Sequence, residues 1–341
     1  MAQVTIAAPG QNKGTGDRLA LFLKMFAGEV LTAFTKKSVT NGRHVERSIT
    51  SGKSAQFPGF GRASAAYLQA GGNLDDLRTN IQSFEKTIVI DGLLTSDCLI
   101  FDLDEAMAHY DFRSEYSRQL GEALARAQDG SVLAEIAKMV VEDTANLDEL
   151  GKGKIVTASV PEADYGETEA MGVAIFKQLL QIKTAMSENH IPTEDRYCYI
   201  KPVALNALIA NKDVINKLYG ATMTIEGNNP PKLIGFELIE TPELTAGGVD
   251  NTNVLQGNGH IFPADYKDNC VMLVAHRSAV GTLTLKGLAM EHARRANLQA
   301  DEIIAKYAKG FGALRPEAAF MGVITKEGGT VTPPSGEGSG D

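Results

Sequence analysis

Apolar residues recur at helical spacing in two long stretches of the chain. The first is the run GDRLALFLKMFAGEVLTAF near the N-terminus, where residues three or four positions apart share one face and Asp17 can serve as the N-cap. The second covers residues 102–142 and is interrupted at Asp129-Gly130, so it predicts one unusually long helix or two in line. The apolar stripe of the first helix consists of Leu19, Phe22, Leu23, Phe26, Val30 and Phe34.

Between these helices the pattern changes to that of β-strands. Residues 38–62 alternate apolar and polar positions, and residues 86–101 are rich in β-branched side chains. The stretch between them, residues 63–84, is polar and contains glycine. Residues 45–100 are therefore predicted to form a long two-stranded excursion with a loose tip. Excursions of this length are uncommon in compact domains and are usually functional.

The second half of the chain mixes short helical and extended patterns, which predicts a mixed α+β fold. Residues 146–166 have the composition of a linker, residues 287–309 have helical propensity, and residues 326–341 are predicted to be a flexible tail. Between these segments we expect helices over about 167–189 and 202–210, and strands at 196–200, 235–240 and 270–276.

Charge is distributed unevenly along the 341 residues. The formal net charge is −9, but residues 1–62 carry nine Lys and Arg against three acids, a balance of +6 that leaves −15 on the remainder. A basic arm on an acidic body indicates either contact between the arm of one copy and the body of another, or simply a solvated basic tail.

The sequence does not have the features of a membrane or secreted protein. It lacks a basic start followed by an apolar core, so we expect no signal peptide, and it has no run of eighteen apolar residues that could span a membrane. The three cysteines, Cys98, Cys198 and Cys270, are widely separated and odd in number. They predict reduced thiols and not a disulfide framework.

The stretch RSITSGKSAQFPGFG contains Gly52-Lys53-Ser54, which matches the end of a phosphate-binding loop. Such a loop also requires a glycine five positions before the Gly-Lys pair and a helix after it. Arg47 occupies the glycine position, and Pro58 and Gly59 would break a helix within a turn. The sequence therefore disfavours nucleotide binding here.

Other chemical motifs are also lacking. The six histidines show no metal-ligand spacing, and there is no Gly-x-Ser-x-Gly elbow. His276 and Ser278 suggest a base and a nucleophile, but no acid partner accompanies them in the sequence. We therefore expect no catalytic residue, no metal site and no cofactor, although acids and bases can converge from distant positions in a fold.

Several long blocks, taken in order, resemble one family. They are GDRLALFLKMFAGEVLTAF, SITSGKSAQFPGFGRASAAYL, DGLLTSDCLIFDLDEAMAHYDFRSEYSRQLGEALARAQDGSVLAEIA, HRSAVGTLTL and ARRANLQADEIIAKYAKGFGALRPEAA. Together they are similar to the major capsid proteins of short-tailed, T-seven-like bacteriophages (podoviruses, autographiviruses). The likeness covers nearly the whole chain and weakens in residues 143–165, 211–232 and 249–268.

The resemblance implies the α+β fold of HK97-like capsid proteins, with an N-terminal arm, an E-loop, a P-domain with a spine helix, and an A-domain. It also implies a long strand in NLQADEIIAKYAKG, which we expect in place of the helix because tertiary context overrides propensity. The implied division is 1–49 for the arm, 50–100 for the E-loop, 101–165 for the P-domain with its spine helix at about 112–142, 166–295 for the A-domain, 296–325 for the return of the P-domain, and 326–341 for the flexible tail.

The function implied is structural: a subunit that assembles with itself into pentamers and hexamers of an icosahedral head enclosing double-stranded DNA. Implied partners are a scaffolding protein, a portal at one vertex, and DNA bound without sequence specificity. The virion, assembled in the cytoplasm of a host bacterium, is the implied location. Two alternatives are a cellular nanocompartment shell of the same fold and a cytosolic nucleotide-binding enzyme. The expected contacts between subunits are Leu19, Phe22, Phe26, Phe34, Arg47, Lys53, Phe57, Arg62 and Arg78.

Overall fold

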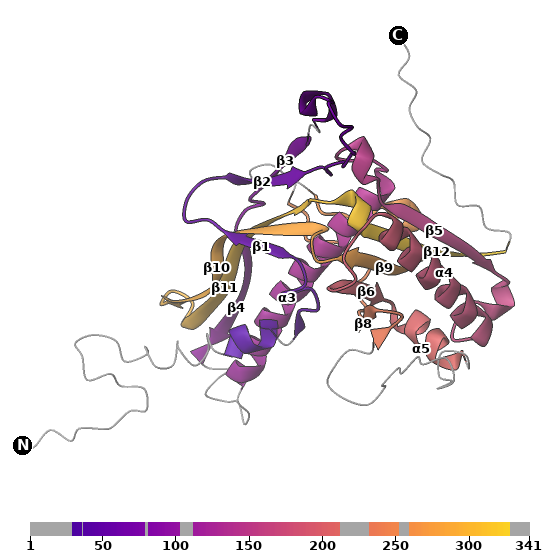
Figure 1. Cartoon of the computed structure of the whole chain (residues 1–341). Coiled ribbons are helices and arrows are strands. Elements are labelled where there is room, and N and C mark those ends of the chain that lie inside the picture. The colour runs from indigo at the N-terminus through magenta and orange to yellow at the C-terminus, as the bar shows by residue number, and fades with distance from the viewer. Residues whose placement is uncertain are drawn as a thin grey trace, which may run out of the picture.

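One long helix lies between two β-sheets, and a separate β-hairpin projects beyond them (Figure 1). The computed structural model describes residues 29–35, 37–78, 81–102, 112–211, 232–251 and 259–327. The predicted Asp17 cap and the first part of the N-terminal apolar stripe lie outside these residues, as does most of the predicted C-terminal tail.

The long helix, α3, spans Phe112–Val141 without a break. The predicted interruption at Asp129-Gly130 does not occur. Both residues lie within the helix and contact other segments of the chain. A Cβ atom at Gly130 would lie 1.9 Å from the carbonyl oxygen of Gly247, so only glycine allows the loop around Gly247 to approach the helix this closely. The prediction of one helix of unusual length is confirmed.

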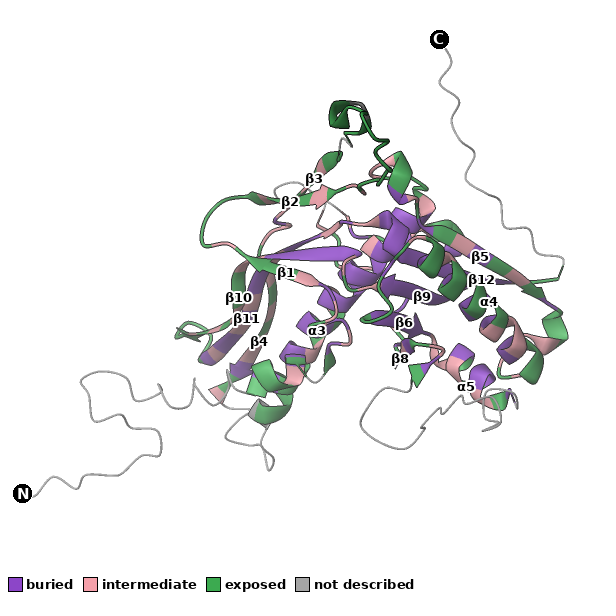
Figure 2. Ribbon diagram, in the orientation of Figure 1, coloured by how far each residue is buried: buried purple, intermediate pink, exposed green. Residues whose placement is uncertain are grey.

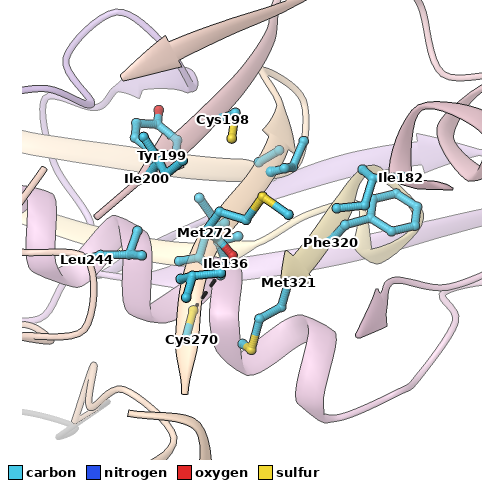
Figure 3. Close-up of a cluster of buried hydrophobic side chains, with 14 of the residues drawn as sticks. Ile136, Ile182, Cys198, Tyr199, Ile200, Leu244, Cys270, Met272, Phe320 and Met321 are labelled. Atoms are coloured by element: carbon cyan, nitrogen blue, oxygen red, sulfur yellow. Dashed lines mark hydrogen bonds between the residues drawn. The ribbon is translucent and has the colours of Figure 1, made fainter. Parts of the chain in front are cut away.

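The larger sheet has six strands in the order β5-β12-β9-β6-β8-β7. Helices α3 and α4 both pack against it, and α5 packs against α4. Figure 3 shows its core, in which Ile136 of α3 and Ile182 of α4 lie among side chains of the strands. The bounds are β5 (Lys154–Val160), α4 (Glu169–Glu188), β6 (Arg196–Ile200), α5 (Pro202–Ala210), β7 (Lys232–Leu233), β8 (Phe236–Glu240), β9 (Cys270–His276) and β12 (Ala319–Lys326).

The linker prediction for residues 146–166 is wrong in its middle part. Strand β5 lies there and pairs in parallel with β12 along its whole length. The glycines and charges on either side of KIVTASV gave the stretch the composition of a linker, but its apolar side chains are covered by α3 and α4. The other predicted elements of this half, α4, α5, β6, β8 and β9, are present.

The smaller sheet has four strands in the order β1-β10-β11-β4, with bounds β1 (Val45–Ser48), β10 (Val280–Arg295), β11 (Ala300–Ala313) and β4 (Leu94–Phe101). Strands β10 and β11 form a long antiparallel ribbon. The strand expected in NLQADEIIAKYAKG is therefore confirmed, and the helical propensity of residues 287–309 is overridden. Buried Ile303, Ala305 and Tyr307 of β11 pack against α3, and a strand suits this alternating burial.

The predicted two-stranded excursion over 45–100 is shorter than expected. Only β2 (Ser54–Phe60) and β3 (Ser83–Val89) form the separate hairpin, with Ser54 paired to Val89 and Phe60 to Ser83. The outer parts of the stretch, β1 and β4, belong to the smaller sheet instead. The sequence showed where extended segments lie, but not which strands pair.

The helical residues 29–35 pack on α3 beside the smaller sheet. Val30 and Phe34 are buried there with Leu120 and Leu124 of α3. A Cβ atom at Gly121 would lie 2.6 Å from the Val30 carbonyl oxygen, so a glycine in the middle of α3 lets the two helices touch. The arm is thus joined to the rest of the subunit by a close contact between its helix and α3.

Candidate assembly surfaces

The β2–β3 hairpin carries an exposed apolar cluster at its tip. Residues 61–82 connect the two strands and include a short 3-10 helix, Leu74–Leu77, which the side chain of Asn73 caps. Figure 2 shows this tip as a mostly exposed region at the top of the molecule. Its large apolar side chains are from about one third to fully exposed: Phe60, Tyr67, Leu68, Leu74, Leu77 and Ile81.

This cluster differs from isolated exposed apolar residues, which are normal on any protein surface. Tyr67 is completely exposed, and Phe60 and Leu74 are 69% and 67% exposed. All six side chains lie within 22 consecutive residues at the end of a projecting hairpin. An exposed cluster of this kind is typical of a surface that another chain covers.

The root of the hairpin is fixed firmly to the smaller sheet. The Ile90 amide donates to the Lys53 carbonyl oxygen at 2.9 Å, and the Asp91 amide donates to the Lys309 carbonyl oxygen at 3.1 Å. Ile88 and Ile90 are buried against the sheet. The hairpin therefore presents its tip from a rigid base.

A second contact holds the beginning of the tip against the larger half of the molecule. The Arg62 amide donates to Glu149 Oε1 at 2.9 Å, and the Arg62 guanidinium donates to the Asn189 carbonyl oxygen. Beyond Arg62, Arg78 pairs with nearby Asp75, and Asn73 caps the short 3-10 helix, so these contacts lie within the tip itself. Residues 63–75 are all exposed, so this part of the tip is less covered than the root of the hairpin.

The arm is fixed to α3 by a buried carboxylate. Asp129, 3% exposed, accepts hydrogen bonds from the Ser38 hydroxyl at 2.7 Å, the Thr40 hydroxyl at 2.6 Å, and the amides of Val39 and Thr40 at 2.9 and 3.1 Å. Burial raises the pKa of Asp129, and these four hydrogen bonds oppose that rise. One side chain of α3 therefore binds three consecutive residues of the turn that leads from the arm helix to β1.

The predicted contact residues fall into different environments. Leu19, Phe22 and Phe26 lie outside the described residues. Phe34 is 5% exposed and packs edge-on against Tyr307, so it offers little surface to a neighbour. The remaining residues lie on or beside the hairpin: Arg47, Lys53, Phe57, Arg62 and Arg78.

Arg47 and Phe57 form a contact within the chain. The Arg47 guanidinium donates to the Gln56 carbonyl oxygen at 2.6 Å and lies 5.7 Å from the centre of the Phe57 ring. Phe57 is half-buried against the smaller sheet, whereas Arg47 is exposed. Lys53 and Arg78 are also exposed, so a second chain can reach both side chains, although Arg78 also pairs with Asp75.

Sequence reasoning did not single out Phe60, Tyr67, Leu74 or Gly121, and it noted Asp129 only as part of an interruption of the helical pattern. A signal for the first three existed, because large apolar residues recur in a stretch that is otherwise polar and rich in glycine. Gly121, like Asp129, is a poor helix former inside a strong helical pattern, and it could have been noted for that reason. Their partners, residues 30–40, could not have been identified without the fold.

The described residues lack the geometry of a nucleotide or metal site. Ser54 begins strand β2 and not the helix that follows the Gly-Lys-Ser of a phosphate-binding loop. Within the described ranges, no group of three His, Cys, Asp or Glu could hold a metal ion. His276 Nδ1 lies 2.8 Å from the Ser278 hydroxyl and accepts from the Ser278 amide at 3.2 Å, so the pair closes a turn.

Replacing Lys53 with alanine is expected to change no nucleotide affinity. The ammonium of Lys53 is exposed beside a strand, with no cradle of backbone amides to hold a phosphate. Calorimetric titration of ATP and GTP into the wild-type protein and the Lys53→Ala variant should show no binding to either. Stoichiometric binding to the wild type that disappears in the variant would contradict this interpretation.

None of the helices in the described part of the chain has the length and apolar character needed to cross a bilayer. This agrees with the sequence, which has no apolar run of that length.

Comparison with known proteins identifies relatives over most of the chain. A model of the Gp10A-like family, described as a major capsid protein, matches residues 56–323. The major capsid protein of Escherichia phage T7 is 48% identical over 93% of this chain and 96% of its own length, and that of Enterobacteria phage T3 is 48% identical over 93% and 96%. The capsid structure of the Cyanophage P-SCSP1u is 33% identical, covers 95% of this chain and 100% of its own, and has a TM-score of 0.69.

Proposed function

Because this chain belongs to the Gp10A-like family of major capsid proteins and is a structural subunit of a phage capsid with the HK97-like fold, we propose that it assembles into the pentamers and hexamers of an icosahedral head. It acts as a building block and not as an enzyme. The observation that carries the proposal is the exposed apolar tip of a rigidly rooted hairpin.

The hairpin is the part of the subunit that we assign to contact with a neighbour. Its tip projects beyond both sheets in Figure 1, and its six large apolar side chains are between 37% and fully exposed in the part of the chain that the structure describes. A closed shell surrounds every subunit with identical copies, so one exposed surface per subunit can be buried at every position. Lys53 and Arg78 lie on the same hairpin and would meet polar or acidic groups of that neighbour.

The domain boundaries inferred from the family remain our proposal for how the subunit is divided. In that division, α3 is the spine helix of the P-domain, the hairpin is the E-loop, and residues 166–295 form the A-domain. The strand order supports close coupling of these parts, since β5 and β12 from outside the A-domain pair in one sheet with β9. The A-domain and the P-domain would therefore move little relative to each other.

We further propose that the head is assembled in the bacterial cytoplasm on a scaffolding protein, has a portal at one vertex, and encloses double-stranded DNA. The charge distribution supports the enclosure of DNA. The balance of −15 outside residues 1–62 means that most of the subunit would not bind the DNA phosphates tightly. DNA could then be packed without sequence-specific contacts.

The proposal is tested by electron microscopy of the protein expressed with and without a scaffolding protein. Closed shells of uniform size are expected with the scaffold. Soluble subunits or small ring-shaped oligomers under both conditions would contradict assembly into a head.

Hydrogen exchange should locate the contact on the hairpin. Amides of residues 63–78 are expected to exchange quickly in unassembled subunits, because this loop lies outside the paired strands, and much more slowly in shells. Amides of α3 should be protected in both states, because its apolar face is buried within the subunit. Equal protection of the tip in both states would show that no neighbour covers it.

A further inference from the structure

Three segments far apart in the sequence meet at the side chain of His260. The ring is 2% exposed, with Nδ1 2.7 Å from Glu135 Oε1 and Nε2 2.8 Å from Asp91 Oδ2. Asp91 follows the hairpin strand β3, Glu135 belongs to α3, and His260 lies on the connection that leads to β9. One imidazole thus joins the root of the hairpin to the long helix.

The two short contacts determine the protonation of the ring. A neutral imidazole has one N–H donor and one bare nitrogen, and a bare nitrogen does not attract a carboxylate. Glu135 is kept ionised by Lys138, whose ammonium lies 3.2 Å from the same Oε1 atom. With a carboxylate at each nitrogen, the ring is held as the imidazolium, which donates two charge-assisted hydrogen bonds.

Asp91 lies at the root of the hairpin, so this cluster can control how the hairpin moves relative to α3. Gly92 follows it with a φ of 139°, a conformation that side-chain-bearing residues rarely adopt, so the chain can pivot there. A cavity of about 90 Å³ lies beside the pivot, lined by Leu93, Val249 and Phe311 among others. Gly92 and the cavity therefore leave room for the hairpin root to change its angle if the contacts of His260, which add to those that fix the root, are lost.

We propose that protonated His260 is a latch that fixes the hairpin root to α3, and that loss of its proton releases the hairpin at the Gly92 pivot. This latch is a property of the single subunit, so it does not depend on which neighbour the hairpin meets. It would set the angle at which the tip is presented.

The surrounding charges determine the pH at which the latch would open. Burial lowers the pKa of His260, but the hydrogen bonds to Asp91 and Glu135 outweigh this and raise the pKa to about 9. Burial raises the pKa of Glu135, yet His260 and Lys138 bring it below its ordinary value. Lys309 and Asp250 also line the adjacent cavity, and the edge of the His260 ring faces Phe311 at 5.5 Å between centroids.

The sign of the pH effect follows from this raised pKa. The stabilising contribution of His260 is complete below about pH 6.5, the ordinary pKa of histidine, and is lost as the pH rises through about 9. The latch is therefore closed at neutral pH and opens only under alkaline conditions. It acts mainly as a positioning device in the cell.

The direct test uses nuclear magnetic resonance of the full-length, unassembled subunit with ¹³C-labelled histidine. The His260 signal, assigned by its absence in His260→Asn, should titrate with a midpoint near 9. Asp91→Asn retains the shape of the side chain but removes one carboxylate, so it should lower the midpoint by at least one pH unit. A wild-type midpoint below 7 would overturn the proposal whether or not the variants fold.

Hydrogen exchange tests the mechanical part. In His260→Asn at pH 7, protection factors of residues 88–94 should fall at least tenfold relative to the wild type, whereas those of α4 should not change. The matched control is His190→Asn, because His190 is exposed and its left-handed φ of 53° suits asparagine. Protection at 88–94 within twofold of the wild type in His260→Asn would show that the ring does not latch the hairpin.

Discussion

Replacing Phe60, Tyr67 and Leu74 together with serine is expected to give a folded subunit that forms almost no closed shells. The three side chains are between 67% and fully exposed in the single chain, so the subunit loses little burial when they are removed. Surface substitutions of this kind usually change the free energy of unfolding by less than about 0.5 kcal/mol each. The loss should therefore appear in assembly and not in folding.

The expected effect on assembly is large because each contact is repeated throughout the shell. Burying a large apolar side chain completely contributes about 1.5–3 kcal/mol, so three of them account for several kcal/mol at every hairpin contact. Even half of that loss weakens the equilibrium constant of each association step by at least tenfold. Sedimentation and negative-stain microscopy should show free subunits or incomplete assemblies in place of shells.

The control is a polar substitution in the same loop. Gln69→Ser shortens an exposed side chain between Tyr67 and Leu74 without removing apolar surface, and shells should form in normal yield. Normal shells from the triple variant would mean that the tip is not covered by a neighbour, and the assignment of the hairpin as the contact surface would fail. Failure of both variants would instead indicate that the loop conformation matters more than its apolar side chains.

The order of elements could largely be predicted from the sequence, whereas the pairing of strands could not. Periodic burial in α3 and α4 leaves a 3.6-residue pattern, and the short buried strands β6 and β9 are nearly continuous apolar runs. Strand β5 escaped notice because glycines and lysines surround it. Its neighbour in the sheet, β12, lies more than 150 residues away, and no local pattern encodes that pairing.

The candidate surfaces could also be predicted from the sequence only in part. The long excursion over residues 45–100 was predicted to be functional because excursions of this length are uncommon in compact domains. The polar residues that hold it in place were not recognised, since Asp91, Glu135 and His260 have meaning only once three distant segments meet. His260 was set aside for lack of metal-ligand spacing, yet its role in the structure depends on carboxylates that are 125 and 169 residues away.

The arm also differs from the sequence-based expectation in one respect. The apolar stripe was expected to be buried by other copies, but its last members, Val30 and Phe34, are core residues of their own chain. The physical reason is the glycine at position 121, which lets the arm helix approach α3 closely enough to share its core. A deletion that begins at the N-terminus should therefore stop before residue 29 if the body is to stay intact.

Replacing Asp129 with alanine is expected to destabilise the subunit by about 3 kcal/mol or more and to detach the segment from Ser38 to Thr40. Four donors converge on this carboxylate, and Ser38 and Thr40 are 8% and 0% exposed, so they cannot easily find water instead. A buried donor left without a partner costs about 1–3 kcal/mol. Relief of the cost of burying Asp129 itself offsets part of this loss.

Urea unfolding of the unassembled subunit measures the change in free energy, and hydrogen exchange measures the local release. Residues 38–48 should lose protection at least tenfold in Asp129→Ala, because β1 follows directly from the released turn and adds only four residues to the smaller sheet. Ser38→Ala removes one of the four donors and should cost only about 1 kcal/mol. The matched control is Asp148→Ala, an exposed aspartate that should change the free energy of unfolding by less than about 0.5 kcal/mol. If Asp129→Ala behaves like this control, the arm must be held by its other contacts, such as its apolar packing on α3, and the buried carboxylate would not be its anchor.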